Sequence, residues 1–129
     1  MSGGSVADPD VRAWSLLSGL GRVGFGVAML LTPEPALRAL GFDQVGSATI
    51  TVTRLAGVRD LVLGLVTLAA LQDRERLRAA TIADAVADTG DALAFSLALG
   101  SAERSAGSRG LTAAVPAAIA GAWTAWRLS

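Results

Sequence analysis

Seven charged residues interrupt three long apolar stretches of this chain, and their types and positions suit them to chemistry. They are Arg22 in the first stretch, Arg54, Arg59 and Asp60 in the second, and Asp84, Asp88 and Asp91 in the third. Each stretch is long enough to cross a lipid bilayer, where an ionisable side chain is energetically costly. Such side chains usually face the interior of a helix bundle or a wet cavity. The seven residues therefore mark the predicted functional site.

The residue types that are missing restrict the chemistry to carboxylates. The sequence contains no Cys, His, Tyr or Lys, which excludes thiol nucleophiles, imidazole acid–base catalysis and a tyrosine acid. We therefore predict that carboxylates donate and accept protons and that the remaining charged groups bind the substrate. The predicted catalytic residues are Asp88, Asp91 and Asp60, and the predicted substrate-binding residues are Arg22, Arg54, Arg59 and Asp84.

The spacing of the charges predicts that they meet in one layer. Asp84, Asp88 and Asp91 follow one another at i, i+4 and i+7, which places them on one face of a helix. Arg59 and Asp60 are about 100° apart around their helix, so they are predicted to face different neighbours. Counting inward from the helix ends brings five charges from three helices close to the middle of the bilayer. These are Arg22, Arg59, Asp60, Asp88 and Asp91.

Three Arg against four Asp leaves one carboxylate in excess, and this excess has two interpretations. In the first, the charges form an internal salt-bridge network that holds the helices together, and one Asp is protonated. In the second, the spare carboxylate is the working group, as a proton donor and acceptor or as part of a cation or substrate site.

Two motifs resemble known ligand sites but lack their context. The Asp run is similar to the Mg²⁺ sites of membrane CDP-alcohol phosphotransferases, yet Ala92 replaces a required Gly, Phe95 stands where Ala-Arg should begin, and the second half of that motif is missing. Gly19-x-Gly21-x-x-Gly24 matches the dinucleotide fingerprint as a string but lies within an apolar helix, without the strand that the motif requires. We predict no metal and no cofactor.

The elements that position these residues are predicted to be helices throughout. Asp8-Pro9 is typical of a helix start, and Thr32-Pro33 of a helix end. Four long helices are expected at about 9–31, 47–71, 79–99 and 110–126, with a short interfacial helix at 33–40 that ends at Gly41. The prediction is an all-α integral membrane four-helix bundle in a single domain, 1–129. A soluble helical bundle is the alternative, but residues 110–126 carry no charge.

Arg and Trp positions predict the orientation. Five Arg residues flank the side of the bundle that carries both termini, and three flank the other. Because Arg accumulates on the cytoplasmic side, both termini are predicted to be cytoplasmic, in the cell inner (plasma) membrane. Trp14, Trp123 and Trp126 fall at that same face, as interfacial anchors do. The formal net charge is zero, which disfavours a nucleic acid partner and leaves membrane lipid as the expected one.

The block Arg54-Leu55-Ala56-Gly57-Val58-Arg59-Asp60-Leu61-Val62-Leu63-Gly64, followed by a helix with Asp84, Asp88 and Asp91, resembles a family of small four-helix membrane proteins catalogued as domain of unknown function 4267. The resemblance covers most of the chain. It implies a four-helix membrane fold and leaves the reaction open.

Three functions remain as hypotheses. The first is an acid–base site that acts on a lipophilic, isoprenoid- or lipid-like substrate by isomerisation or cyclisation, with Asp88 or Asp91 as the proton donor or base. The second is a proton-linked transporter or channel that works as a homo-oligomer. The third is a structural or accessory membrane protein whose charges form a salt-bridge core.

Overall fold

The computed structural model describes residues 8–43, 45–98 and 104–129, and these fold into five helices. They are α1 (Pro9–Leu31), α2 (Pro33–Ala39), α3 (Ser47–Ala70), α4 (Arg74–Ala98) and α5 (Arg104–Arg127). No strand occurs in those three ranges, so the all-α prediction is confirmed. The short fifth helix is α2, at the place expected for the interfacial helix, and Gly41 after it takes the positive φ of 92° that favours glycine.

Two helix starts were predicted too late. α4 begins at Arg74 instead of residue 79, because the Asp73 carboxylate accepts a hydrogen bond from the backbone N–H of Arg76 at 3.0 Å and so caps the first turn. α5 begins at Arg104, so 104–109 is helical where a polar loop was expected. Gly110 lies in this helix, against the Phe95 ring. A Cβ at this position would overlap the ring, so packing favours glycine here. Residue 99, the predicted end of the third long helix, and 101–103 of the predicted loop lie outside the described residues.

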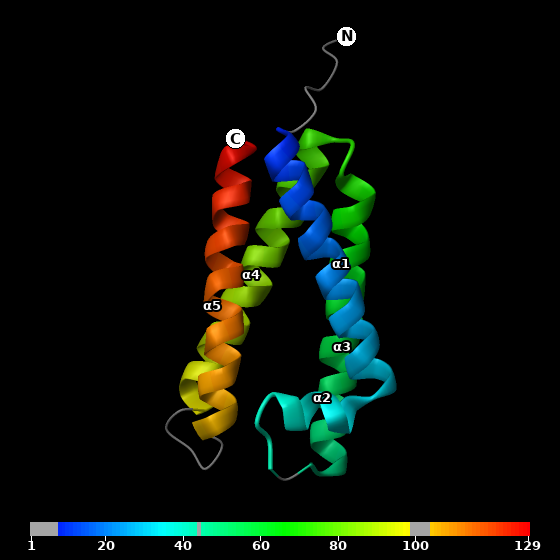
Figure 1. The fold of residues 1–129 in the computed structure, drawn as a ribbon, viewed down its shortest axis with the longest axis vertical. Helices are drawn as coiled ribbons and strands as arrows, with labels where there is room; N and C mark the ends of the chain where they lie inside the picture. The colour runs from blue at the N-terminus through cyan, green and yellow to red at the C-terminus, as the bar shows by residue number, and fades with distance from the viewer. Residues whose placement is uncertain (1–7, 44, 99–103) are drawn as a thin grey trace.

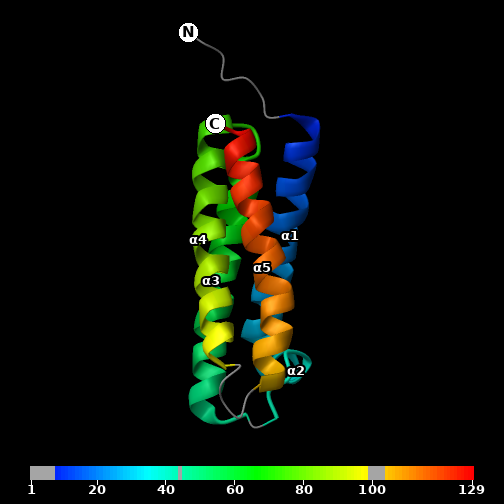
Figure 2. The same cartoon turned by 90° about the vertical axis from the view of Figure 1, so that its left-hand side faces the viewer.

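The four long helices form two pairs, α1 with α3 and α4 with α5 (Figure 1). The pairs lie close together at the end that holds the start of α1 and the end of α5, and they diverge toward α2. The view turned by 90° shows the four long helices running side by side along the length of the molecule (Figure 2). Contacts between the pairs run mainly from α3 to α4.

Glycines allow α1 and α3 to approach until their backbones touch. A Cβ added to Gly26 would lie 2.7 Å from the carbonyl oxygen of Gly57, and one added to Gly64 would lie 2.7 Å from that of Gly19. At these four positions only glycine lets the two backbones lie this close together, beside the charges of α1 and α3. Gly21, on the same helix, has open space around its Cβ position, so it has no packing role.

Charged and hydroxyl side chains are buried beside a small apolar core. A small apolar core of Val11, Ala70, Leu77, Ala80 and Leu128 lies where the helix pairs meet. The other buried positions include Asp60, Asp84, Asp88 and the threonines 53, 67, 81 and 124. Large apolar side chains point outward from every long helix, including Leu17, Leu55, Val86 and Ile119. An outer surface of this kind is what a lipid or protein environment would cover.

By length and composition, α1 is the one helix in the described ranges that is apolar enough to cross a membrane. The other long helices are of similar length, but α3 and α4 carry the charges identified above.

Candidate functional site

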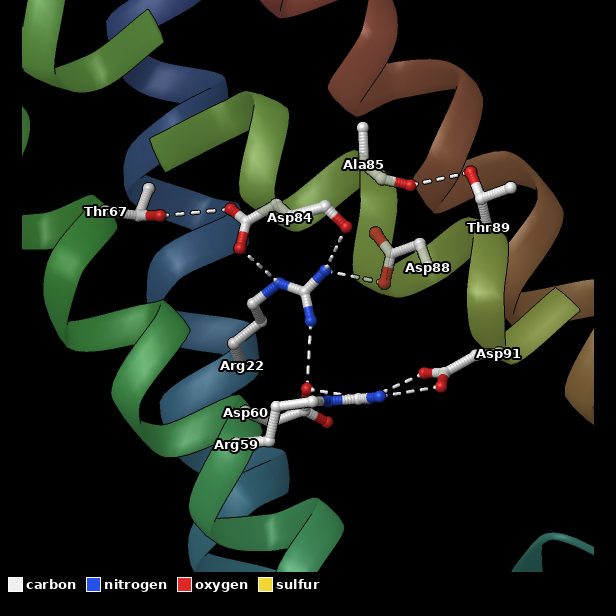
Figure 3. A network of polar contacts seen from close by, with 9 residues as sticks. All are labelled: Arg22, Arg59, Asp60, Thr67, Asp84, Ala85, Asp88, Thr89 and Asp91. Carbon is white, nitrogen blue, oxygen red and sulfur yellow. Dashed lines mark hydrogen bonds and ion pairs between the residues drawn. The ribbon is translucent and has the colours of Figure 1, made fainter. Parts of the chain in front are cut away.

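Arg22 lies at the centre of a buried network and joins α1 to both α3 and α4 (Figure 3). Its Nη1 donates to Asp60 Oδ1 at 3.0 Å, and its Nη2 donates to Asp88 Oδ1 and to the backbone carbonyl of Asp84. Its Nε lies 3.1 Å from Asp84 Oδ1, an ion pair without the alignment of a hydrogen bond. The Arg22 side chain is only 11% exposed. One guanidinium thus contacts three carboxylates from two helices.

Arg59 forms the second centre and points toward α4. Its Nη1 and Nη2 donate to the two oxygens of Asp91 at 2.8 and 2.7 Å, the paired geometry that orients a carboxylate most firmly. Its Nη2 also donates to Asp60 Oδ1 at 3.1 Å. Arg59 and Asp91 are more accessible than Arg22, with 38% and 33% of their side chains exposed.

The two centres are continuous because Asp60 Oδ1 accepts from both guanidinium groups. Asp60 therefore faces α1 and Arg59 faces α4, as their separation around the helix predicts. The two side chains also contact each other. The structure brings together six of the seven predicted site residues, Arg22, Arg59, Asp60, Asp84, Asp88 and Asp91.

Arg54 is the predicted site residue that does not join them. It is exposed on α3 and takes part in none of the network's ion pairs. The network therefore contains two guanidinium groups and four carboxylates, an excess of two carboxylates where the sequence suggested one.

Thr67 belongs to the network although sequence reasoning missed it. Its hydroxyl donates to Asp84 Oδ2 at 3.0 Å, and its side chain is fully buried. A signal was present, since Thr67 follows Asp60 by seven residues and so lies on the same face of α3.

A cavity of about 350 Å³ lies between the helix pairs, beside this network. Its polar wall is formed by Arg22, Arg59, Asp60, Asp88 and Asp91. Its apolar wall includes Phe25, Met29, Leu40 and Phe95, so every helix pair contributes to it. Such a site can hold an apolar molecule while presenting it with carboxylates.

Asp60 and Asp88 line this cavity, and each has one carboxylate oxygen outside its ion pairs. Each uses Oδ1 for its ion pairs, and neither Oδ2 has a partner among the described residues. Arg59 Nε is likewise buried without a hydrogen-bond partner in that part of the chain. The cluster therefore retains hydrogen-bonding capacity beyond its internal contacts.

A second, smaller cavity of about 180 Å³ lies closer to the end of the bundle where α1 begins and α5 ends. Its lining is rich in hydroxyl groups, from Ser15, Thr67, Thr81 and Thr124, and it also includes Asp84. Asp88 lines both cavities. In the described ranges, no group of three acidic residues is arranged to hold a metal ion.

The fold and the network define a helical protein in which two helix pairs enclose a buried Arg/Asp layer. The chain belongs to the family described as Domain of unknown function (DUF4267), whose model matches residues 19–125. That match includes every residue of the network and confirms the resemblance drawn from the Arg54–Gly64 block. No curated protein and no solved structure matches the chain.

Proposed function

We propose that this chain is an integral membrane protein whose four long helices cross the bilayer. These helices contain 23, 24, 25 and 24 residues, which at about 1.5 Å per residue exceeds a hydrocarbon core of about 30 Å. The outward apolar side chains and the inward charges support the same environment. Because their charged side chains are buried in ion pairs, α3 and α4 can enter lipid although they carry these charges.

The proposed orientation places both termini in the cytoplasm, in the cell inner (plasma) membrane. The exposed side chains of Trp14, Trp123 and Trp126 support this interface, because indole rings prefer the headgroup level. The Arg127 guanidinium lies 5.5 Å from the Trp123 ring centre, so cationic and aromatic groups gather at the same end.

Within that membrane, the site is proposed to act as an acid–base centre on a lipophilic, isoprenoid- or lipid-like molecule. The observation that supports this most is the cavity that joins an apolar wall to Asp88 and Asp91. Isomerisation and proton-initiated cyclisation are the reactions that suit it, because both return the proton that they consume.

The two carboxylates suit different roles. Asp91 is held at both oxygens by the two Nη atoms of Arg59, and this fixed position suits a base. Asp88 lines the cavity and has one oxygen outside its ion pair, which suits a proton donor. In the proposed step, the Asp88 O–H bond breaks, a C–H bond forms at a substrate double bond, and the adjacent carbon becomes cationic. Loss of a neighbouring proton to Asp91 forms the new double bond, and proton exchange between the carboxyls restores the site.

The test compares wild type with Asp88→Asn and Asp91→Asn, each purified in detergent. Thermal unfolding is measured together with native mass spectrometry of lipids that co-purify. Variants that stay folded but lose or change a bound lipophile support the proposal. Arg54→Gln is the matched control, because it removes a charge from α3 outside the network. Collapse of both Asn variants, with no ligand in any form, would indicate a purely structural salt-bridge core.

A second candidate is a proton-linked transporter or channel, working as a homo-oligomer. The position of Asp88 on the walls of both cavities favours it, because a transported proton needs a carboxylate that two compartments can reach. Reconstituted liposomes containing a pH-sensitive dye would test it. Proton flux that Asp88→Asn abolishes, from a protein that is oligomeric in detergent, supports transport, and a proton-tight liposome argues against it.

A further inference from the structure

We propose that the molecule bound in the larger cavity carries a positive charge on an apolar body, as a lipophilic ammonium ion does. This inference rests on the proposed function, since it names the chemical class of the cavity's ligand. Three properties of the cavity wall support it: its charge balance, its free oxygen atoms and its aromatic rings.

The charge balance of the network favours a cation over an anion. Four carboxylates face two guanidinium groups, and the two guanidinium groups already contact all four carboxylates. An anionic ligand would have to displace one of these ion pairs. A cation would instead offset the excess of carboxylates in a region where uncompensated charge is costly.

The free oxygens give the cation specific contacts. The side chains of Asp60 and Asp88 are only 7% and 11% exposed, so both carboxylates are buried. Both residues line the same cavity, and the Oδ2 of each has no partner among the described residues. Once Asp88 has given up its proton, both carboxylates have acceptor capacity left beside the cavity, so a positively charged group that approaches them is favoured.

The aromatic rings complete a site for a cation that is poorly hydrated. Phe25 of α1 and Phe95 of α4 line the cavity together with the carboxylates. The faces of aromatic rings attract ammonium groups, and recognition of quaternary ammonium ligands uses this attraction. The apolar side chains of Met29 and Leu40 then leave room for a hydrocarbon body.

The experiment compares three probes that share one alkyl chain: dodecyltrimethylammonium, dodecanol and dodecanoate. Binding to the full-length protein in a neutral maltoside detergent is measured by native mass spectrometry and by the shift in Tm. The cation is expected to bind at least about tenfold more tightly than the alcohol, and the anion to bind most weakly.

Two variants locate the effect. Asp88→Asn is expected to reduce the affinity for the cation by about tenfold and to leave the affinity for dodecanol unchanged. Phe25→Leu keeps the ion pairs and the apolar wall, so it tests the aromatic contribution even if Asp88→Asn does not fold. Phe25→Leu is expected to weaken the binding of the cation and to leave the binding of the other two probes unchanged.

The outcomes separate this inference from the proposed function. Equal binding of all three probes, or tightest binding of dodecanoate, overturns the inference while leaving a lipophile site in place. Failure of every probe to bind overturns the inference and the proposed function together. Preference for the cation that is lost in Asp88→Asn or in Phe25→Leu supports both.

Discussion

Arg22 and Asp60 are 38 residues apart in sequence, and their Nη1 and Oδ1 atoms are 3.0 Å apart in the fold. This contact links α1 to α3 at the level where Asp84 and Asp88 arrive from α4. Asp60 is also the only carboxylate of the described network that contacts both guanidinium groups. The ion pair therefore connects the tightly packed helix pair to the wall of the cavity.

Removing Arg22 should destabilise the fold strongly. Arg22→Gln leaves three buried carboxylates without their central cation, and losing one partner of a buried ion pair costs about 3 kcal/mol or more. Thermal unfolding in detergent measures the effect. Arg54→Gln should change stability by less than about 0.5 kcal/mol, since Arg54 is exposed and outside the network. Equal effects of the two variants would contradict the central position of Arg22.

The contact between α1 and α3 should not tolerate a methyl group. Gly26→Ala would place its Cβ 2.7 Å from the Gly57 carbonyl oxygen, so the helices must separate, at a cost of about 1–3 kcal/mol. Gly24→Ala is the matched control, because nothing lies within 4 Å of its Cβ position, and it should be neutral or slightly stabilising. Unfolding midpoints of the two variants check this, and a neutral Gly26→Ala would rule out the close approach.

Loss of the Thr67 hydroxyl should lower the stability measurably, although the side chain keeps its shape. Thr67→Val removes the hydrogen bond to Asp84 Oδ2 and leaves that buried oxygen without its donor, at a cost of about 1–3 kcal/mol. Thr51→Val removes an exposed hydroxyl that bonds only to the backbone of its own helix. Denaturation of both variants in parallel should show a loss only for Thr67→Val.

Membrane topology can be tested with single cysteines, since the sequence contains none. The exposed residues Ser129, at the end of the chain, and Asp43, between α2 and α3, lie at opposite ends of the long helices. Ser129→Cys should react with an impermeant maleimide only when the cytoplasmic face is accessible. Asp43→Cys should react in intact spheroplasts. Labelling of both from the same side would contradict the proposed crossing of the membrane.

The sequence predicts those parts of this protein that depend on local signals. The bounds of α1 agree with prediction because Pro9 and Pro33 mark them, and the spacing of Asp84, Asp88 and Asp91 identifies a common face. Arg54 could have been separated from Arg59 by the same geometry, since five residues rotate a side chain by about 140°.

Other features depend on distant contacts and are not encoded locally. The pairing of Arg22 with Asp60, Asp84 and Asp88, and of Arg59 with Asp91, is set by how three helices lie against one another. The packing of Gly110 in α5 against the Phe95 ring of α4 is another such contact. The cavity exists because the helix pairs diverge toward α2, which no periodicity indicates.

The claim that a lipophilic molecule occupies the larger cavity is tested most directly by filling that cavity. Gly21 lines it and has open space at its Cβ position, so Gly21→Leu should fill the cavity without altering any ion pair. Gly24→Leu is the control, because it has the same open space and does not line either of the two cavities described above.

Native mass spectrometry of wild type and both variants, at equal thermal stability, provides the measurement. Loss of the co-purifying lipophile in Gly21→Leu, with its retention in Gly24→Leu, is the predicted result. Retention of the lipophile at the wild-type level in Gly21→Leu would contradict the account.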